Sequence, residues 1–465
     1  MNRVDHAIGF RCCAAAVALL LQAQVVHAQV VDDQLLPAPQ AHTFTLTAEP
    51  GRYSSPVIAI NGIQPQQLVV AFQPMARAAY SIDGAAHWAI EQGTGAPAPY
   101  RSFVDTSVAY DRNGYAIMCF TALDGVGPFK YWGHNPKRNA VLVRRSPDGG
   151  KTWEPRSIPV IEHADGPGIP FEDLPAITAD VQPHSPHVGN LYVAWTQDRM
   201  EDSLILLARS VDGGLTWSKP VRVSEKAGGP RDDNGIVAGV RGVVAPDGAL
   251  HLVWSDAGHV VHSVSHDGGK TFSRNQSIVD AGPFHFQALN VSEANGYPQI
   301  GMMAQDNDGR PRLYVTWSDF RNGDVDIFCI SSTDGGRSWS AAVRVNNDSL
   351  HNAADQLFPS LAVDSTTGAV NVMFYDRRRD PSNRSADVVL ARSTDGGRTF
   401  VNYLLSEQPF DPRGGALGEY TTVTALGGRV YGSWTEIVRP SGTATPDANT
   451  RPAAIVRMGV ADFGK

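Results

Sequence analysis

The sequence is poor in charge and in long apolar runs. Charged side chains make up only 18% of the 465 residues, and the longest apolar run, from Cys12 to Leu21, has about ten residues. A helix that crosses a bilayer needs about 20 apolar residues, so we expect no membrane span. The low charge also leaves little for the exposed faces of long helices, while 45 glycines and 31 prolines indicate frequent turns. Together these features favour a soluble all-β protein.

Cysteine is also scarce. Cys12 and Cys13 lie in the N-terminal apolar run, which leaves Cys119 and Cys329 for the rest of the chain. These two belong to distant copies of the repeat described below. We therefore expect no disulfide between them and interpret both as buried thiols in strands.

Several classes of functional motif are absent. The sequence has neither a Gly-x-Ser-x-Gly nucleophile motif nor a glycine-rich phosphate loop. A net charge of −8 and a pI near 5.9 argue against a nucleic-acid partner. Asn307-Asp308-Gly309 and Asp324-Val325-Asp326 offer too few oxygen ligands for a calcium loop. We predict no metal site and no cofactor.

The N-terminus has the features of a secretory signal peptide. Arg3 and Arg11 precede or begin the apolar run, and Val26-His27-Ala28 forms a small-residue cleavage site. We expect cleavage after Ala28 and a secreted or periplasmic protein. The remainder, residues 29–465, is interpreted as a single domain and as a monomer.

One octapeptide organises the rest of the chain. Ser146 to Trp153 reads SPDGGKTW, and near-complete copies begin at Ser210, Ser265, Ser332 and Ser393, with a decayed copy at Ser81. Asp-Gly-Gly tolerates positive φ, and the Asp and Ser side chains can bond to the amides of their own turn. The copies start 55 to 67 residues apart, a period that suits one four-stranded propeller blade. We interpret every copy as a structural turn.

The strand pattern around the octapeptides predicts the number of blades. Comparable units start near Pro56, Thr106, Pro175, Gly235, Pro298 and Pro359, and a seventh, without an octapeptide, starts near Tyr420. That unit lacks one strand, which His42 to Thr47 could supply from the start of the mature chain. An N-terminal strand in the last blade would close the ring and remove its free edge. The fold class is therefore an all-β propeller of seven blades, with six as the alternative.

The hairpin order predicts two different ends of the ring. The octapeptides and the first turn of each blade should share one end, which we call the octapeptide end. The opposite, loop-lined end collects long irregular segments, including Asp124–Asn139, Gly166–Leu174, Ala281–Tyr297 and Arg413–Tyr420. Binding and catalytic residues usually lie on such loops, so we expect the functional site there.

A second repeated sequence motif lies at the end of the second strand in several blades. It pairs an acid with an arginine in Trp317-Ser318-Asp319-Phe320-Arg321 and in Phe374-Tyr375-Asp376-Arg377, and Arg199 follows Asp198 in a third blade. Arginines converging on the axis would form an anion site, because guanidinium binds carboxylate in a bidentate manner. The alternative is that they pair with the acids of adjacent blades and hold the rim together.

The octapeptide resembles the Asp box, or bacterial neuraminidase repeat, of sialidase-like propellers. Sialidases bind the substrate carboxylate with three arginines and use an aspartic acid as acid/base and a tyrosine nucleophile activated by a glutamate. The resemblance implies Tyr420 as nucleophile, Glu419 as its activator and Asp173 as acid/base. It implies substrate binding by Arg199, Arg321, Arg377, Asp319, Asp376 and Trp132. The place of the family's Arg-Ile-Pro motif reads Ser54-Ser55-Pro56 here.

Two functions remain open at this stage. The first is a glycoside hydrolase acting on glycans, possibly an exo-sialidase, at the loop-lined end. A generic hydrolase needs two carboxylates roughly 5 to 10 Å apart. The alternative is a non-catalytic propeller that binds carbohydrate or protein through aromatic loops at Phe129–His134 and Phe284–Phe286. The candidate acids are Asp105, Glu172, Asp173, Asp232, Asp233, Asp355, Asp376 and Glu419.

Overall fold

The computed structural model describes residues 33–91, 98–125, 138–164, 169–230, 235–305, 310–439 and 452–464. All regular secondary structure in these ranges is β-strand, which confirms the all-β class. Across the same ranges no helix has the length and hydropathy required to cross a bilayer.

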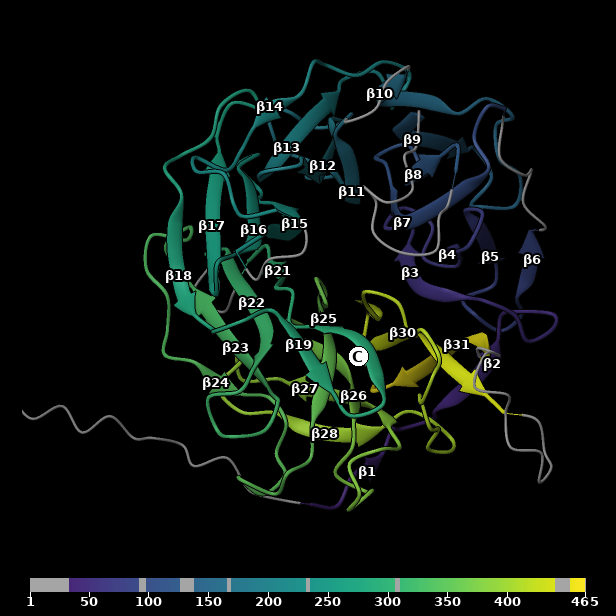
Figure 1. Cartoon of the computed structure of the whole chain (residues 1–465), viewed down its shortest axis with the longest axis vertical. Helices are drawn as coiled ribbons and strands as arrows, with labels where there is room; N and C mark the ends of the chain where they lie inside the picture. Colours follow the sequence, from purple (N-terminus) through teal and green to yellow (C-terminus); the bar gives the residue numbers. More distant parts are fainter. Residues whose placement is uncertain are drawn as a thin grey trace, which may run out of the picture.

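Seven four-stranded sheets follow one another around a ring, as Figure 1 shows. The innermost strand of each sheet contacts the innermost strand of the next, from blade 1 to blade 7 and back to blade 1. The predicted seven-bladed propeller is therefore confirmed. Blades 1 to 4 are β3(Ser54–Ile60), β4(Leu68–Gln73), β5(Arg77–Ser81), β6(Ala89–Glu91); β7(Ser102–Tyr110), β8(Ala116–Leu123), β9(Arg138–Ser146), β10(Ile158–Ala164); β11(Phe171–Ala179), β12(Leu191–Asp198), β13(Ser203–Ser210), β14(Val221–Arg222); and β15(Val237–Val244), β16(Leu250–Asp256), β17(His259–Ser265), β18(Gln276–Asp280). Blades 5 to 7 are β21(Gln299–Met303), β22(Arg312–Asp319), β23(Asp326–Ser332), β24(Val343–Arg344); β25(Gln356–Val363), β26(Val370–Asp376), β27(Asp387–Ser393), β28(Val401–Leu404); and β29(Thr422–Leu426), β30(Arg429–Val438), β31(Ala453–Asp462), β2(His42–Thr45).

Each octapeptide folds as a turn that satisfies its own polar groups. In the first full copy the Gly150 amide donates to Ser146 Oγ at 2.8 Å, and the Thr152 amide donates to Asp148 Oδ1 at 2.8 Å. The Thr152 hydroxyl donates to the other carboxylate oxygen at 2.7 Å. The copies beginning at Ser210, Ser265, Ser332 and Ser393 repeat these bonds. Turn chemistry therefore accounts for the repeated residues.

The second glycine of the octapeptide also sets the contact between blades. A Cβ atom on Gly150 would lie 2.9 Å from Val69 Cγ2 in the preceding blade, closer than real Cβ contacts allow. Gly269 and Gly397 meet Tyr192 and Tyr314 of their preceding blades in the same way, at 3.1 and 3.2 Å. Only glycine combines this close approach with positive φ. The turns thus fix how each blade packs on its neighbour.

The N-terminal segment closes the ring. Strand β2 pairs antiparallel with β31, with His42 opposite Val460, and completes blade 7 as predicted. A further short strand, β1(Leu36–Pro37), adds parallel to the outer edge of blade 6, with Leu36 opposite Tyr403. The segment that begins the described chain therefore joins two neighbouring blades.

Both remaining cysteines are buried free thiols, as predicted. Cys119 lies in β8 and Cys329 in β23, and neither forms a disulfide. Burial raises the pKa of each thiol to about 12, so both are protonated at neutral pH.

A hairpin not predicted from the sequence lies between blades 4 and 5. Strands β19(His285–Ala288) and β20(Val291–Asn295) pair antiparallel. Figure 1 shows β19 over the inner part of the ring, near β25. Ala288, Val291 and Ala294 pack in one apolar cluster with Leu357 and Phe358 of blade 6. The hairpin therefore lies across the loop-lined end.

We expect Asp212→Ala, in the octapeptide turn of blade 3, to destabilise the fold. The substitution leaves the Thr216 amide and hydroxyl without the carboxylate that accepts their hydrogen bonds at 2.9 and 2.6 Å. The loss should be about 1–3 kcal/mol in the free energy of unfolding, measured by urea denaturation. Glu225→Ala removes an exposed carboxylate with no partner among the described side chains and should change stability little. Equal effects of the two variants would contradict a stabilising turn.

The same turns predict acid sensitivity. The hydroxyl of Ser338 lowers the pKa of Asp334 to about 2, and the amide and ring of His87 lower that of Asp83 to about 2. A depressed folded pKa gives stability that is complete above the unfolded value, near 4, and lost as pH falls toward 2. The thermal midpoint should therefore drop between pH 4 and pH 2. An unchanged midpoint over that range would contradict the stabilising role of the ionised carboxylates.

Candidate functional site

Five of the seven inner strands carry the same β-bulge. The register of β3, β7, β11, β15 and β25 against its partner shifts at one equivalent place, and one residue of each bulge has positive φ. These residues are Ser55, Asp105, Leu174, Gly239 and Phe358. A non-glycine residue at positive φ costs of order 1 kcal/mol, and bulges of this kind redirect side chains near functional sites. The five bulges therefore lie at the same height along the axis of the ring.

Tyr420 fills the axis at this level. Its side chain is buried in an apolar cluster with Leu174 and Tyr297, which come from two other sectors of the ring. Its hydroxyl donates to the carbonyl of Thr106, in the bulge of β7, at 3.1 Å. The guanidinium of Arg241, from β15, lies 4.8 Å from the ring centroid. Residues from blades 2, 4 and 7 therefore meet across the axis.

Charged groups of both signs act on Tyr420. Burial raises its pKa well above 10, the carboxylates of Asp105 and Glu419 raise it further, and Arg241 opposes them. Burial lowers the pKa of Arg241, while Tyr420 and Asp105 counteract that effect. Asp105 is itself buried and accepts a hydrogen bond from Gln73 Nε2 at 3.2 Å. The arrangement combines two carboxylates, one guanidinium and one phenol, and we call these four residues the axial cluster. Asp105 and Tyr420 are buried, and Arg241 and Glu419 are half-buried.

The β19–β20 hairpin is hydrogen-bonded to this cluster. Asn295 Nδ2 donates to the Glu419 carbonyl at 2.9 Å and to its carboxylate Oε2 at 3.2 Å. The amide of Glu419 donates to Ser55 Oγ at 2.9 Å. Tyr297 lies two residues after Asn295 in the chain, and its hydroxyl is 2.8 Å from His285 Nε2. The hairpin therefore fixes the orientation of the Glu419 carboxylate.

Tyr420 and Glu419, both singled out in the sequence, are thus brought together with Asp105 and Arg241. Asp173 lies within β11, one residue before the bulge residue Leu174, and it is buried. Trp132 lies outside the described residues, as do Asp232, Asp233 and the Phe129–His134 loop.

The three arginines predicted to bind substrate occupy separate ion pairs. Arg199 binds Asp202 through two hydrogen bonds of 2.6 Å. Arg321 binds Asp319 at 2.5 Å, with its guanidinium 4.5 Å from the centre of the Phe328 ring. Each pair lies within a single blade.

Arg377 is fully buried beside Asp355, at 3.8 Å. Asp376 is buried too and binds Arg378 at 2.8 Å, while burial raises its pKa. These ion pairs join residues of the same blade rather than of adjacent blades, although Arg321 Nη2 also donates to the Asp280 carbonyl of blade 4 at 3.2 Å. Among the described residues no contact joins any two of Arg199, Arg321 and Arg377.

Other candidate acids also have structural partners. Glu172 is buried and accepts hydrogen bonds from His163 Nε2 at 2.5 Å, from Gln197 Nε2 at 2.7 Å and from the indole of Trp195. Asp355 accepts from Asn383 at 2.7 Å. Within the described part of the chain, no cluster of three or more histidine, cysteine or acidic side chains is arranged to hold a metal.

Arg241 and Asn295 were not foreseen from the sequence. Arg241 lies in the unremarkable segment Val237–Val244, and only the fold shows that its guanidinium reaches Tyr420. A weak signal for the bulges was present, because Pro56, Pro175 and Pro359 directly follow three of the positive-φ residues. Proline cannot donate to the sheet ladder, so it is compatible with a bulge.

Comparison with known proteins gives a fold likeness and one partial sequence match. No family model matches the chain. A sialidase from Bacteroides fragilis is 30% identical over 126 residues, which span 24% of this chain and 23% of that protein. The matched part is thus about a quarter of each.

Solved structures share the architecture at low identity. An intramolecular trans-sialidase from Ruminococcus gnavus is 11% identical, covers 74% of this chain and 95% of its own, and superposes with a TM-score of 0.51. An α-L-arabinofuranosidase from Fusarium graminearum is 13% identical, with a TM-score of 0.49 over 79% of this chain and 95% of its own. A protein of unknown function from Dyadobacter fermentans is 15% identical, with a TM-score of 0.48 over 91% of this chain and 100% of its own.

These findings define the class of the protein by its fold. The chain is a seven-bladed β-propeller whose fold is similar to that of the trans-sialidase from Ruminococcus gnavus. Its particular chemistry has to be argued from the axial cluster.

We expect Gly239→Ala to disrupt the axial cluster. An added Cβ would lie 2.5 Å from Tyr297 Cγ, and the residue has φ of 70°. Gly335→Ala is the matched control, because its φ is 73° but nothing lies within 4 Å of the new Cβ. Backbone strain is common to both variants, at about 1 kcal/mol. Gly239→Ala should therefore lose at least about 1–3 kcal/mol more in thermal or urea unfolding, the usual range for overpacking. Equal losses would contradict the close packing of Tyr297 on Gly239.

Proposed function

We propose that this chain is a secreted glycoside hydrolase that acts on glycans at the loop-lined end of the ring. The observation that carries the proposal is the convergence of Asp105, Glu419 and Arg241 on Tyr420 from different blades. Cleavage of a glycosidic bond requires a carboxylic acid that donates a proton and a nucleophile that attacks the anomeric carbon. The signal-like N-terminus supports export.

In this proposal the Tyr420 oxygen attacks the anomeric carbon and its proton passes to Glu419. The bond to the leaving oxygen breaks as Asp105, protonated beforehand, donates its proton to that oxygen. Water then attacks the anomeric carbon and gives a proton to Asp105, while the bond to the Tyr420 oxygen breaks and Glu419 returns its proton to that oxygen. Asp173, on the neighbouring inner strand, is the second candidate for the acid/base role. Asn295 keeps the Glu419 carboxylate in position through its hydrogen bond.

Substrate binding must release Tyr420 from its present partner. Its hydroxyl now donates to the Thr106 carbonyl, and burial keeps the phenol protonated. Arg241 favours the phenolate, because a cation near the ring stabilises negative charge. The same guanidinium is the group available to a substrate carboxylate, so exo-sialidase activity is the specific form of the proposal.

The test is a panel of fluorogenic glycosides, sialoside included, with wild type and three variants. Tyr420→Phe, Asp105→Asn and Asp173→Asn each remove one ionisable group while nearly preserving shape. For Tyr420→Phe and for whichever aspartate is the acid/base, kcat should fall by about 100-fold or more, the usual contribution of such groups. The other aspartate variant should retain turnover.

The control is Tyr192→Phe, since Tyr192 contacts the next octapeptide at the far end of the ring. It should turn over substrate like wild type. No hydrolysis of any glycoside by wild type would overturn the proposed function. Retained hydrolysis by Tyr420→Phe would overturn only the role of the tyrosine, and turnover restricted to neutral sugars would overturn the exo-sialidase form.

A separate observation favours a non-catalytic, ligand-binding alternative. A hollow of about 340 Å³ lies beside Phe320 and Arg321. Phe320 is 37% exposed and packs edge to face on Phe286, with ring centroids 4.7 Å apart. An exposed aromatic ring beside a guanidinium suits stacking on a sugar or a protein side chain. Glycan-array binding that Phe320→Ala abolishes, in the absence of any turnover, would favour this reading, whereas Phe284 is buried and unavailable.

A further inference from the structure

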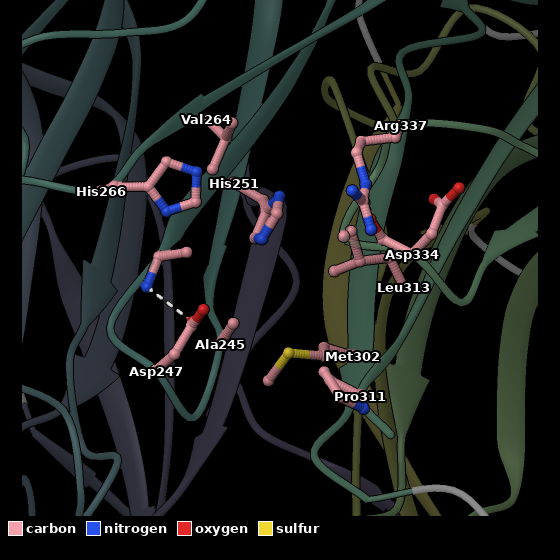
Figure 2. A pocket seen from close by; sticks show the side chains of 12 residues that line it. Ala245, Asp247, His251, Val264, His266, Met302, Pro311, Leu313, Asp334 and Arg337 are labelled. Atoms are coloured by element: carbon pink, nitrogen blue, oxygen red, sulfur yellow. Dashed lines mark hydrogen bonds between the residues drawn. The ribbon is translucent and has the colours of Figure 1, made fainter. Parts of the chain in front are cut away.

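A second cavity lies far from the axial cluster, between blades 4 and 5 at the octapeptide end. Its volume is about 330 Å³. Figure 2 shows its two walls, with Asp247, His251, Val264 and His266 from blade 4 facing side chains of blade 5. The facing side chains are Met302, Pro311, Leu313, Asp334 and Arg337. Small-molecule sites usually span about 300–1,000 Å³, so this cavity suits one small ligand.

One position of the second strand differs between blade 4 and three other blades. Tyr192, Tyr314 and Tyr431 lie three residues before the buried tryptophan in blades 3, 5 and 7, and His251 takes that place in blade 4. The tyrosine rings of blades 3 and 5 lie under the second glycine of the next octapeptide. In blade 4 a different side chain, His262, takes that place, since a Cβ on Gly336 would lie 2.4 Å from His262 Cε1, and His251 lines the cavity instead.

The first glycine of the blade 5 octapeptide, Gly335, borders open space. A Cβ atom on Gly335 would meet nothing within 4 Å, whereas one on Gly396 would lie 2.7 Å from Arg312 Nη1 and one on Gly268 would lie 3.0 Å from His187 Nδ1. The space above Gly335 is therefore open, and Gly335 lines the cavity.

Two buried histidines form the floor of this region. His251 Nδ1 lies 3.0 Å from His262 Nε2, and both rings are 3% exposed. Burial lowers the pKa of His251 to about 3 and that of His262 to about 4, so both are neutral at neutral pH. His251 Nε2 has no hydrogen-bonding partner among the described residues, although its ring lines the cavity. A ring nitrogen that opens on a cavity without a protein partner is available to a ligand or to water there.

The rim supplies donors and acceptors from opposite walls. Asp247 Oδ1 accepts from the Ala249 amide, which leaves Oδ2 without a partner in the described chain. Arg337 is anchored by Nε, which donates to the Asp334 carbonyl at 2.9 Å, and its terminal nitrogens have no recorded partner. Val264, Met302 and Leu313 form apolar surface between these groups. A carboxylate faces a guanidinium here, so an ion of either sign would meet a like charge.

We propose that this cavity binds one neutral sugar residue. Its apolar surface would contact the C–H face of the ring, while Asp247 and Arg337 bind hydroxyl groups at the rim and His251 Nε2 binds one at the floor. Such a site would hold a glycan on the octapeptide end of the ring, independently of any chemistry at the axial cluster.

The experiment refills the cavity with the pair of side chains that blade 3 already carries. Leu207 in blade 3 is equivalent to His262 in blade 4. Leu207 lies opposite Ala194 and His262 lies opposite Val253, and each of these partners directly precedes the tryptophan of its strand. The double variant His251→Tyr with His262→Leu reproduces the Tyr192 and Leu207 pair, which packs under Gly269. The variant should therefore fold.

Saturation-transfer NMR at millimolar methyl glycosides of glucose, galactose and arabinose provides the readout. Wild type should transfer saturation to at least one of them and shift the imidazole resonances of His251. The double variant should lose this transfer at least tenfold, with an unchanged thermal midpoint. N-acetylneuraminic acid, an anionic sugar, should give no His251 shift.

Three results would overturn the proposal. They are the absence of any neutral-sugar binding by wild type, binding that the double variant retains, and a His251 shift produced by the anionic sugar alone. A double variant that fails to fold directs the test to Asp247→Asn and Arg337→Met, on the exposed rim. Unchanged sugar affinity in both rim variants would likewise overturn it.

Discussion

The close approach of each octapeptide turn to the preceding blade is the constraint on which the ring depends. The turn is rigid because its Ser and Asp side chains satisfy its own amides, and its second glycine leaves no room for a side chain between Gly150 and Val69. Blades 2, 4, 5 and 6 therefore meet the preceding blade through the same close glycine contact. Repeated around the ring, this contact accounts for how blades with different loops close on a common axis.

The opposite end of the ring follows a different rule. There the inner strands carry bulges with strained residues such as Asp105 and Phe358, and the side chains of one blade reach across to another. Buried carboxylates and a buried guanidinium are costly unless they compensate one another. The scaffold thus concentrates unfavourable electrostatics at one level of the axis, which is the physical signature expected of a working site.

Much of the fold could be predicted from the sequence because turn chemistry is local. The octapeptide copies indicated hairpins, and their spacing indicated blades. The seventh unit lacked one strand, which pointed to His42–Thr47 as its fourth strand. The candidate site was less accessible, since it depends on which side chains cross the axis. Tyr420 and Glu419 were identified by resemblance, but Arg241 and Asn295 reach them from distant parts of the chain. Arg321 and Arg377 were expected from the sequence to converge on the axis, yet in the structure Arg321 pairs with Asp319 and Arg377 lies beside Asp355.

The position of β2 also bears on how the protein is made. Its partner β31 is formed by residues 453–462, so β2 cannot pair until all of the intervening blades have been synthesised. Contacts of such large sequence separation form slowly, because a long loop has to close before they stabilise the chain. A growing chain in which β31 has not yet formed therefore leaves β2 unpaired and the ring open.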